Sequence, residues 1–343
     1  MEIRKFTARN GTVLPFTVLG FGTAPLGDLF EKLDEKQTVA TVEAAYQAGI
    51  RIFDTSPHYG NGLAESRLGT GLRQATRSDY LMSTKVGRVM NPFARPAADR
   101  SDVISPGFAG GFPHAARFDY SYDGTMRSIE HSLLRMGLDR LDIVLIHDCD
   151  RWTHGPDAEL RFKEAMDGAY QALDKLRSEK VVGAIGVGIN EADTCVKFGK
   201  AGDFDVTMMA GRYSLLDQSG LEEFLPLAEQ KKMGILLAGV FNSGILATGA
   251  IPNAKYDYSN ASPELLEKVR KMEAVCKAHG TTIRRAALQF ALGHPAVVAA
   301  VLGGVKPEEV ISNAKDLNEK VPADLWSELK AQKLLPAHVP VPN

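Results

Sequence analysis

The sequence predicts an α/β protein whose parallel sheet closes into a (β/α)₈ (TIM) barrel, with residues 1–343 forming a single domain. Eight short apolar runs alternate with eight amphipathic segments, which is typical of parallel strands joined by crossover helices. A chain of 343 residues is an ordinary length for one such barrel. The rival, an open doubly wound sheet, lacks its glycine fingerprint, because Pro25 follows Gly20 and Gly22 where a third glycine is required.

Two extended runs open the chain on either side of Asn10 and Gly11, a pair that favours a tight turn, so we expect a short N-terminal β-hairpin. The barrel strands are expected where aliphatic and β-branched residues form short runs bounded by polar turns. These runs cover residues 18–22, 50–53, 80–84, 141–146, 183–187, 206–209, 235–238 and 297–302.

The crossover helices are predicted from apolar residues spaced three and four positions apart. They cover residues 37–48, 65–72, 124–135, 162–178, 191–198, 221–230, 263–279 and 307–318. In the third of these helices we expect Met126, Ile129, Leu133 and Leu134 to face the core together.

The longest stretch without a regular period, residues 87–123, follows the third strand. It is interrupted by several helix and strand breakers, namely Pro92, Pro96, Pro106, Pro113, Gly107, Gly110 and Gly111. A loop of this length in a compact domain is usually functional. We therefore expect an irregular loop that covers a substrate, with an exposed insertion of no functional role as the alternative.

Composition and charge exclude several classes of function. The chain has 44% hydrophobic and 24% charged residues, a formal charge of −2 and a pI near 6.5, which argues against a nucleic-acid partner. Neither a signal peptide nor a membrane span is recognisable, so we expect a cytoplasmic protein with no membrane partner. Cys149, Cys195 and Cys276 are expected to be reduced thiols, and no metal site is predicted, since no His-x-His pair closes a strand.

Four polar side chains lie at or just beyond the ends of three predicted strands. They are Asp54, Tyr59, Lys85 and His147. Taken singly, a polar residue at a strand end is more typical of a turn or a helix cap. A parallel barrel, however, gathers the C-terminal ends of its strands on one face, where ligand sites are built. We therefore interpret the four as candidate catalytic residues.

These residues and the motifs around them resemble the aldo-keto reductase superfamily, whose catalytic tetrad is Asp, Tyr, Lys and His in this order. The resemblance covers essentially the whole chain. It includes the segments 19–23 (LGFGT), 53–60 (FDTSPHYG), 83–85 (STK) and 138–142 (LDRLD). Three further segments are most similar to the bacterial NAD-dependent D-threo-aldose, L-fucose and galactose 1-dehydrogenases and to pyridoxal 4-dehydrogenases: 183–190 (GAIGVGIN), 210–218 (AGRYSLLDQ) and 239–244 (GVFNSG).

Elementary acid–base chemistry suggests a role for each of the four residues. A hydride leaves a carbinol carbon only if a group accepts the hydroxyl proton, and a tyrosine with a pKa of about 10 is a poor base near neutrality. At an effective dielectric constant near 20, the attraction between a lysine cation and a phenolate about 4 Å away is worth about 4 kcal/mol. We therefore expect Lys85 to lower the pKa of Tyr59, with desolvation opposing the shift. Asp54 would keep Lys85 charged, and His147 would direct the substrate oxygen towards Tyr59.

The resemblance also implies a bound nicotinamide dinucleotide. The candidate contacts are Gly22, Thr23, Asn190, Tyr213, Gly239, Phe241, Ser243, Gly303, Glu309 and Asn313. Relatives that prefer NADPH place Lys and Arg around the 2′-phosphate, where this chain has Gly303 and Glu309. A carboxylate there would repel a phosphate, so NAD is favoured, while Lys306 keeps NADP as the minority alternative.

The function implied is hydride transfer from the C1 carbinol of a cyclic aldose to NAD, giving a lactone. Three alternatives stay open: a pyridoxal 4-dehydrogenase, an NADPH-dependent aldehyde or ketone reductase, and a redox-sensing regulatory subunit. Each of the enzymes has a small-molecule substrate. Trp152, His154 and the segment 120–122 carry aromatic and polar side chains that would stack on a sugar or a pyridine ring.

Overall fold

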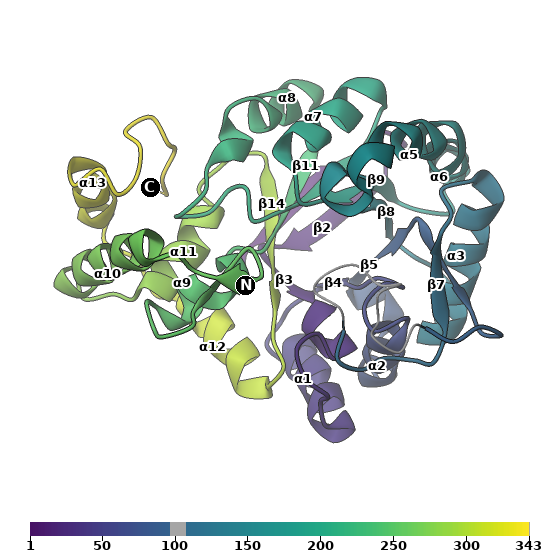
Figure 1. Cartoon of the computed structure of the whole chain (residues 1–343), viewed down its shortest axis with the longest axis horizontal. Helices are drawn as coiled ribbons and strands as arrows, with labels where there is room; N and C mark the ends of the chain where they lie inside the picture. The colour runs from purple at the N-terminus through teal and green to yellow at the C-terminus, as the bar shows by residue number, and fades with distance from the viewer. Residues whose placement is uncertain (97–107, 343) are drawn as a thin grey trace.

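The computed structural model describes residues 1–96 and 108–342, and in it eight parallel strands close into a barrel (Figure 1). Their order around the barrel is β10–β11–β14–β3–β4–β5–β8–β9. The strands are β3 (Leu19–Gly22), β4 (Ile52–Asp54), β5 (Leu81–Val86), β8 (Ile143–His147), β9 (Ala184–Ile189), β10 (Val206–Ala210), β11 (Gly234–Ala238) and β14 (Val297–Gly303). All eight predicted strands are present, and the predicted (β/α)₈ fold is confirmed.

The helices surround the barrel. Those at predicted positions are α1 (Glu35–Gln47), α2 (Leu63–Gly71), α3 (Tyr122–Met136), α5 (Ala158–Glu164), α6 (Tyr170–Ser178), α7 (Ala192–Ala201), α8 (Phe224–Lys231), α10 (Pro263–Ala278) and α12 (Pro307–Asn318). A π-helical turn, Ala165–Ala169, separates α5 from α6, so the predicted helix at 162–178 is interrupted. Four helices were not predicted: α4 (Arg151–His154), α9 (Ile245–Thr248), α11 (Ile283–Ala291) and α13 (Ala323–Ala331).

Capping residues explain where the helices start. Ser121 precedes α3, and its side chain accepts a hydrogen bond from the backbone N–H of Gly124. The helix ends at Gly137, whose φ of 64° places it in the left-handed region that favours glycine. Thr282 caps α11 in the same way, through the N–H of Arg285. That cap was the local signal for the helix that the prediction omitted.

One prediction about α3 was wrong. Ile129 is buried, and Met126 and Leu133 are partly buried against the core, but Leu134 is 79% exposed. At 100° per residue, Leu134 lies about 140° around the helix from Ile129, which is too far for both to face the barrel.

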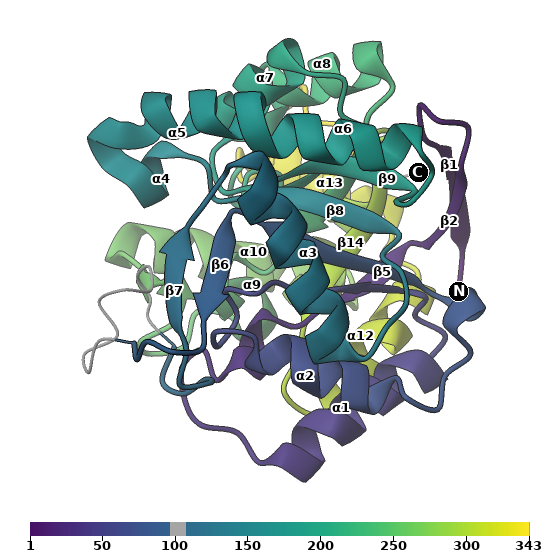
Figure 2. The ribbon, with the colours of Figure 1, turned by 90° about the vertical axis from the view of Figure 1, so that its right-hand side faces the viewer.

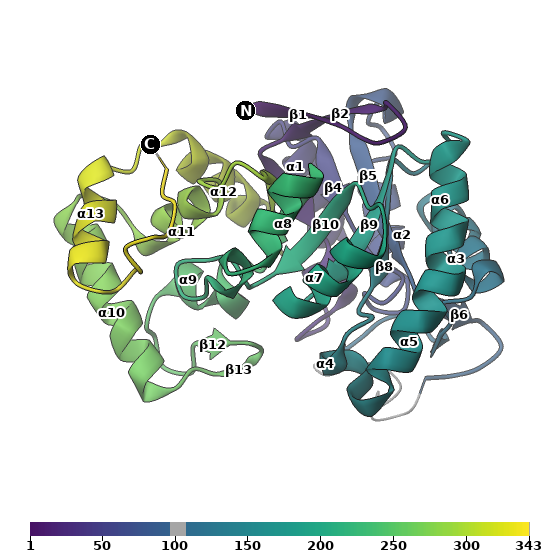
Figure 3. The same cartoon turned by 90° about the horizontal axis from the view of Figure 1, so that it is seen from above.

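The predicted N-terminal hairpin is confirmed as β1 (Ile3–Thr7) paired antiparallel with β2 (Val13–Thr17). Leu14 and Phe16 are buried in a cluster with inward-facing barrel residues, among them Ile52. The hairpin therefore covers the end of the barrel where the strands begin (Figure 3).

A second antiparallel hairpin lies in the segment predicted to be irregular, and here the prediction was wrong. β6 (Arg88–Asn91) pairs with β7 (Ala115–Phe118), and Arg88 lies opposite Phe118. Pro92, Pro96 and Pro113 lie between the two strands, where a missing N–H costs no ladder hydrogen bond. Pro106 and Gly107, with the rest of 97–107, are outside the described residues.

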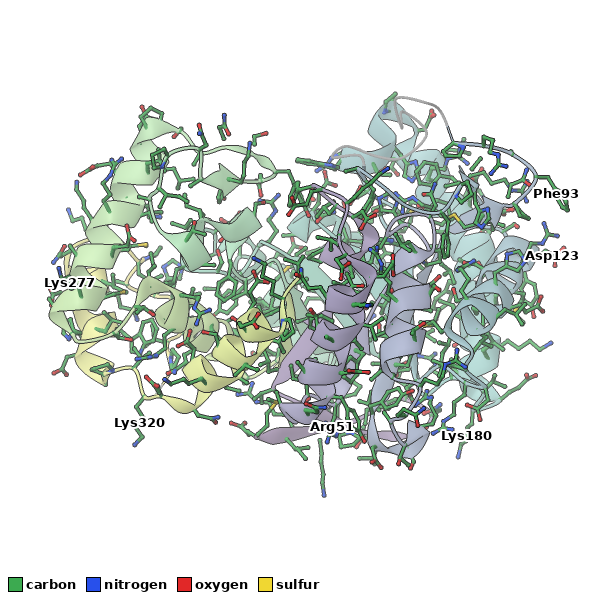
Figure 4. The ribbon with its side chains drawn as sticks, turned by 90° about the horizontal axis from the view of Figure 1, so that it is seen from below. Arg51, Phe93, Asp123, Lys180, Lys277 and Lys320 are labelled. Atoms are coloured by element: carbon green, nitrogen blue, oxygen red, sulfur yellow. The ribbon has the colours of Figure 1, made fainter. Side chains whose placement is uncertain are left out.

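The two hairpins occupy opposite ends of the molecule (Figure 2). Figure 4 labels side chains towards the same two ends: Phe93, 98% exposed, projects on the upper right, whereas Arg51 and Lys180 project at the bottom. In the described part of the chain, none of the helices could cross a membrane. A small third hairpin joins β12 (Lys255–Tyr256) to β13 (Ser259–Asn260) on the way from α9 to α10.

Candidate active site

Three neighbouring strands of the barrel bring the predicted catalytic residues together. Asp54 ends β4, Lys85 lies near the end of β5, and His147 ends β8. Because β4, β5 and β8 are adjacent in the closed sheet, these side chains reach the same end of the barrel. Tyr59 follows on the loop after β4.

Lys85 and Asp54 form a buried ion pair. The Nζ atom of Lys85 lies 2.5 Å from Oδ2 of Asp54 and also donates to the carbonyl oxygen of Thr55 at 2.8 Å. The other carboxylate oxygen of Asp54 accepts a hydrogen bond from the Ser83 hydroxyl at 2.8 Å. Burial raises the pKa of Asp54, and Lys85 opposes that rise. Removing either partner would leave a charge buried without compensation.

Tyr59 lies between the lysine and the histidine. The Nζ atom of Lys85 is 4.9 Å from the centroid of the Tyr59 ring, and the ring of His147 meets that ring nearly edge on, with centroids 5.8 Å apart. The phenol, the amine and the imidazole therefore share one small region at the end of the barrel. This is the arrangement that proton transfer to or from a substrate oxygen requires.

The expected effect of Lys85 on Tyr59 was wrong in its net direction. Burial, followed by the negative charges of Asp54 and Asp148, raises the pKa of Tyr59 well above its usual value. The reason is that Asp54, 2.5 Å from Nζ, neutralises the field of Lys85 at the phenol, so desolvation dominates. In this structure Tyr59 is a protonated acid near neutral pH.

His147 is a neutral imidazole in a polar cage. Burial, followed by the charges of Lys85, Arg88 and His58, lowers its pKa well below the usual range. Its Nδ1 atom lies 3.0 Å from the Ser56 hydroxyl and 3.5 Å from Arg88, while its Nε2 atom lies 3.4 Å from the Asp148 carboxylate.

Tyr120 supports the histidine from behind. Its hydroxyl donates to the backbone oxygen of His147 at 2.9 Å and lies 3.0 Å from Nε2 of His154. Tyr120 is 1% exposed, so this member of the expected substrate-stacking group serves the site as a support. Trp152 of that group is 47% exposed.

A model of the aldo/keto reductase family matches residues 18–333. The chain belongs to this family. It is therefore an oxidoreductase that uses a nicotinamide cofactor and acts on a small-molecule substrate.

Several relatives match along nearly their full length. A pyridoxal 4-dehydrogenase from Microbacterium luteolum is 37% identical over 96% of this chain and 97% of its own. A D-threo-aldose 1-dehydrogenase from a Pseudomonas species is also 37% identical, over the same shares of the two chains. An L-galactose dehydrogenase from Arabidopsis thaliana is 30% identical over 91% of this chain and 88% of its own.

Solved structures agree on the fold. An aldo-keto reductase from Bacillus halodurans in its holo form has a TM-score of 0.74 and 21% identity, covering 98% of both chains. A glycerol dehydrogenase from Gluconobacter oxydans has a TM-score of 0.73 and 21% identity, covering 99% of this chain and 97% of its own.

Three of the predicted cofactor contacts lie near the catalytic end of the barrel. Gly22 ends β3 beside Asp54, and Thr23 binds the Asp54 carbonyl through both its N–H, at 2.9 Å, and its hydroxyl, at 3.1 Å. Asn190 lies beyond the end of β9, with its amide nitrogen 3.5 Å from the Asp148 carboxylate. These positions place all three close to the catalytic residues.

Tyr213 is placed differently. It is 1% exposed, it stacks on Phe290 with centroids 5.1 Å apart, and its hydroxyl points to the backbone oxygen of Pro340 at 3.5 Å. Those contacts join the segment after β10 to α11 and to the C-terminal segment. A cofactor contact by Tyr213 stays a prediction, and packing accounts for what the structure shows of it.

The loop after β11 has the backbone of an anion-binding turn. Gly239, Asn242, Ser243 and Gly244 all have positive φ angles, and Phe241 does not. Phe241, with a negative φ, is followed by left-handed Asn242, and such a pair turns successive N–H groups towards one point, which suits a phosphate. Asn242 also fastens the loop, since its side chain donates to the Gly211 carbonyl at 3.2 Å. This residue was missed by the sequence analysis, although it stands between two predicted contacts.

The expected adenosine end lies where β14 meets α12. Gly303 is exposed at the end of β14, and Asn313 is buried on α12. Glu309 accepts a hydrogen bond from the N–H of Val305 at 2.8 Å, so its carboxylate is turned back onto the loop that precedes the helix. A dinucleotide that runs from the catalytic end past the loop after β11 to the start of α12 stays a prediction.

Arg88 and Asp148 are the important site residues that the sequence analysis missed. Asp148 directly follows His147, and Arg88 comes three residues after Lys85. Two signals were available: a charged residue next to a predicted catalytic histidine, and an arginine close after a buried strand. The second signal was obscured because 87–123 was interpreted as an irregular loop.

Proposed function

We propose that this protein is an NAD-dependent dehydrogenase that oxidises the C1 carbinol of a cyclic aldose to a lactone, and that the chain acts as a single barrel domain. The observation that carries the proposal is the partly buried Tyr59 in contact with Lys85 and His147, in a chain that is 37% identical to a D-threo-aldose 1-dehydrogenase. The equal identity to a pyridoxal 4-dehydrogenase makes pyridoxal oxidation the second candidate.

Each residue has a role in this reaction. A bound nicotinamide would supply the hydride acceptor for the carbinol carbon, and the hydroxyl proton would pass to the oxygen of Tyr59. Neutral His147 donates a hydrogen bond to the same substrate oxygen, which orients it. Because Tyr59 is protonated in this structure, it must lose its proton before oxidation, whereas it is ready to donate in the reverse reduction.

The proposed preference for NAD depends on charge at the adenosine end. Glu309 places a carboxylate at the start of α12, and a second carboxylate, Glu308, lies beside it. A 2′-phosphate brought to this position would be repelled. Lys306, the residue before the helix, is the cation that would favour NADP.

A substrate screen tests the reaction. Purified protein is mixed with NAD and a panel of D- and L-aldoses and pyridoxal, and the absorbance of reduced nicotinamide is followed. We expect turnover of aldoses with lactone as the product. Turnover of pyridoxal alone would replace the proposal by the second candidate. Turnover only of aldehydes or ketones with NADPH would overturn both.

Cofactor titration tests the preference. We expect NAD to bind at least about tenfold more tightly than NADP, a difference of about 1.4 kcal/mol. Glu309→Gln should narrow that ratio by raising the affinity for NADP. Glu308→Gln removes an equal charge one position away and should narrow the ratio less than Glu309→Gln does. Equal affinities of the wild-type protein for the two dinucleotides would contradict the assignment.

A further inference from the structure

Arg88 is an arginine buried beside His147 that makes no contact with Tyr59 or Lys85 in the described interactions. Only 4% of it is exposed. Its guanidinium stacks over the ring of Phe118 at 4.7 Å, and one nitrogen lies 3.0 Å from the Asp148 carboxylate. Ser128 donates from its hydroxyl to the backbone oxygen of Arg88 at 3.2 Å. The β6–β7 hairpin therefore holds a cation in a fixed place at the end of the barrel (Figure 2).

The position of this cation restricts the histidine. One terminal nitrogen of Arg88 lies 3.5 Å from Nδ1 of His147. A guanidinium has only donors, so it can face Nδ1 favourably only when that nitrogen carries no proton. Ser56 agrees with this assignment, because its oxygen already accepts from the N–H of His58 at 3.1 Å and its own proton is free to point at Nδ1, 3.0 Å away.

We propose that Arg88 is a positioning residue that makes Nδ1 of His147 a hydrogen-bond acceptor, so that Nε2 carries the ring proton. Asp148 completes the arrangement from the other side. One of its oxygens pairs with Arg88, and the other lies 3.4 Å from Nε2 of His147. An anion near Nε2 and a cation near Nδ1 select the same tautomer.

Asp148 is held for this purpose by an unusual backbone. Its φ of 47° is in the left-handed region, which is sparsely populated for residues other than glycine, although Asp tolerates it better than most. Its N–H donates to the carbonyl oxygen of Gly188 at 3.0 Å, and Asn190 approaches its carboxylate at 3.5 Å. The turn directs the carboxylate between the arginine and the imidazole.

The remaining groups around the imidazole fit the same assignment. Lys85 from β5, Arg88 from β6 and His58 from the loop after β4 all disfavour a positive charge on His147. Tyr59 presents its ring edge on, and Asp148 is the acidic group within contact distance. A neutral ring with its proton on Nε2 is the state that satisfies both neighbours of the two nitrogens.

The tautomer of His147 matters for the proposed function because it decides whether the ring can donate a hydrogen bond to the substrate oxygen. If Nε2 carries the proton, His147 can donate it in a hydrogen bond to the substrate oxygen. If the proton were on Nδ1, the ring would present a lone pair to that oxygen and repel it. Arg88 would then influence turnover without touching the substrate.

The test is NMR of the full-length protein labelled with ¹⁵N in histidine, which distinguishes protonated from unprotonated ring nitrogens. The His147 signals are assigned by their loss in His147→Gln. In the wild-type protein we expect protonated Nε2 and unprotonated Nδ1 from about pH 6 to 8. In Arg88→Met we expect a mixture of tautomers and a rise of at least about one unit in the pKa of His147, a tenfold change in proton affinity.

Arg77→Met is the matched control. Arg77 also pairs with an aspartate, Asp142 at 2.6 Å, and stacks on an aromatic ring, Tyr80 at 4.9 Å, but it lies away from the three strand ends that carry the site. Its loss should destabilise the protein without changing the His147 signals. Arg88→Lys, which restores a cation, should return the pKa of His147 towards the wild-type value. If Arg88→Met does not fold, Phe118→Leu loosens the guanidinium and should give a smaller shift in the same direction.

An unchanged tautomer and pKa of His147 in folded Arg88→Met would overturn the inference. So would a wild-type His147 with its proton on Nδ1. Neither readout needs a substrate, so failure of the substrate screen would leave this result standing. Conversely, loss of the tautomer preference would leave the aldose assignment untouched.

Discussion

The two larger hairpins have the same local structure and opposite uses. The β1–β2 hairpin, at the end where the barrel strands begin, buries Phe16 and Leu14. The β6–β7 hairpin, at the end where the strands finish, buries the charged Arg88. Apolar burial stabilises a barrel wherever it occurs, whereas a buried charge costs free energy and is retained where chemistry needs it. One end of this barrel therefore serves stability, and the other carries the proposed catalytic residues.

The largest effect should come from the catalytic end. Tyr59→Phe removes the proton-transfer group, and we expect kcat to fall by about 10²–10⁴. The thermal unfolding midpoint and the affinity for the dinucleotide should stay close to wild type. Tyr80→Phe, the same deletion at another buried tyrosine, is the control and should keep its activity. Undiminished turnover by Tyr59→Phe would remove Tyr59 from the mechanism.

The opposite end should show the reverse pattern. Phe16→Ala empties a fully buried position under the barrel, and we expect a loss of about 3–5 kcal/mol of unfolding free energy in denaturant titrations. The kcat of the molecules that remain folded should not change. Val13→Ala, at a 54% exposed site of the same hairpin, should cost less than about 0.5 kcal/mol. A drop in kcat for folded Phe16→Ala would contradict the separation of stability and catalysis between the two ends.

The acidity of Tyr59 allows a test by pH. Its pKa lies well above the usual value, so the fraction of phenolate grows with pH throughout the neutral range. We expect kcat/KM for oxidation to rise about tenfold per pH unit from about pH 6 to 9, while reduction shows no such rise. A plateau beginning near pH 7 would mean that bound cofactor and substrate lower this pKa, as first expected from Lys85.

Asp150 links the catalytic end to stability. It caps α4 through the N–H of Thr153, and burial raises its pKa to about 6. The folded protein then binds this proton more tightly than the unfolded chain, so stability falls as the pH rises from about 4 through 6. Asp150→Asn keeps the cap and removes the charge, and two pKa units correspond to a gain of roughly 3 kcal/mol at pH 8.

Denaturant titrations at several pH values check this prediction. The gain should be absent below about pH 3, where the aspartate is protonated in both states. Asp157→Asn, at the exposed position directly before α5, is the control and should change little, because the Asp157 side chain makes no capping hydrogen bond. Equal stability of Asp150→Asn and the wild-type protein at pH 8 would contradict the prediction.

The smallest effect is expected where β1 is tied to the barrel. Arg4 donates to the backbone oxygens of Val297 at 2.6 Å and Leu292 at 3.2 Å. Arg4→Ala should lower the unfolding free energy by about 1–2 kcal/mol and leave kcat unchanged. Lys5→Ala, at an exposed position of the same strand, is the control. A measurable change in kcat for Arg4→Ala would show that the end where the barrel strands begin also affects the reaction.

Local sequence was sufficient for much of this protein. The eight apolar strand runs and the Asn10–Gly11 turn are local patterns, each covering only a few residues. They were therefore enough to predict the barrel and the β1–β2 hairpin. Asp54, Tyr59, Lys85 and His147 could be proposed because a parallel barrel must gather its strand ends. Each of these inferences follows from short-range geometry and the periodicity of one element.

The tertiary structure alone decided the electrostatics. Whether Lys85 lowers the pKa of Tyr59 depends on the distance between Asp54 and the Lys85 amine and on the burial of the phenol. The spacing of these residues along the sequence predicts neither quantity. The pairing of Arg88 with Phe118 joins residues thirty positions apart, so a Pro- and Gly-rich segment concealed a strand that carries a charge to the histidine. Burial and long-range contact are properties of the folded chain, because they depend on what other segments place around each group.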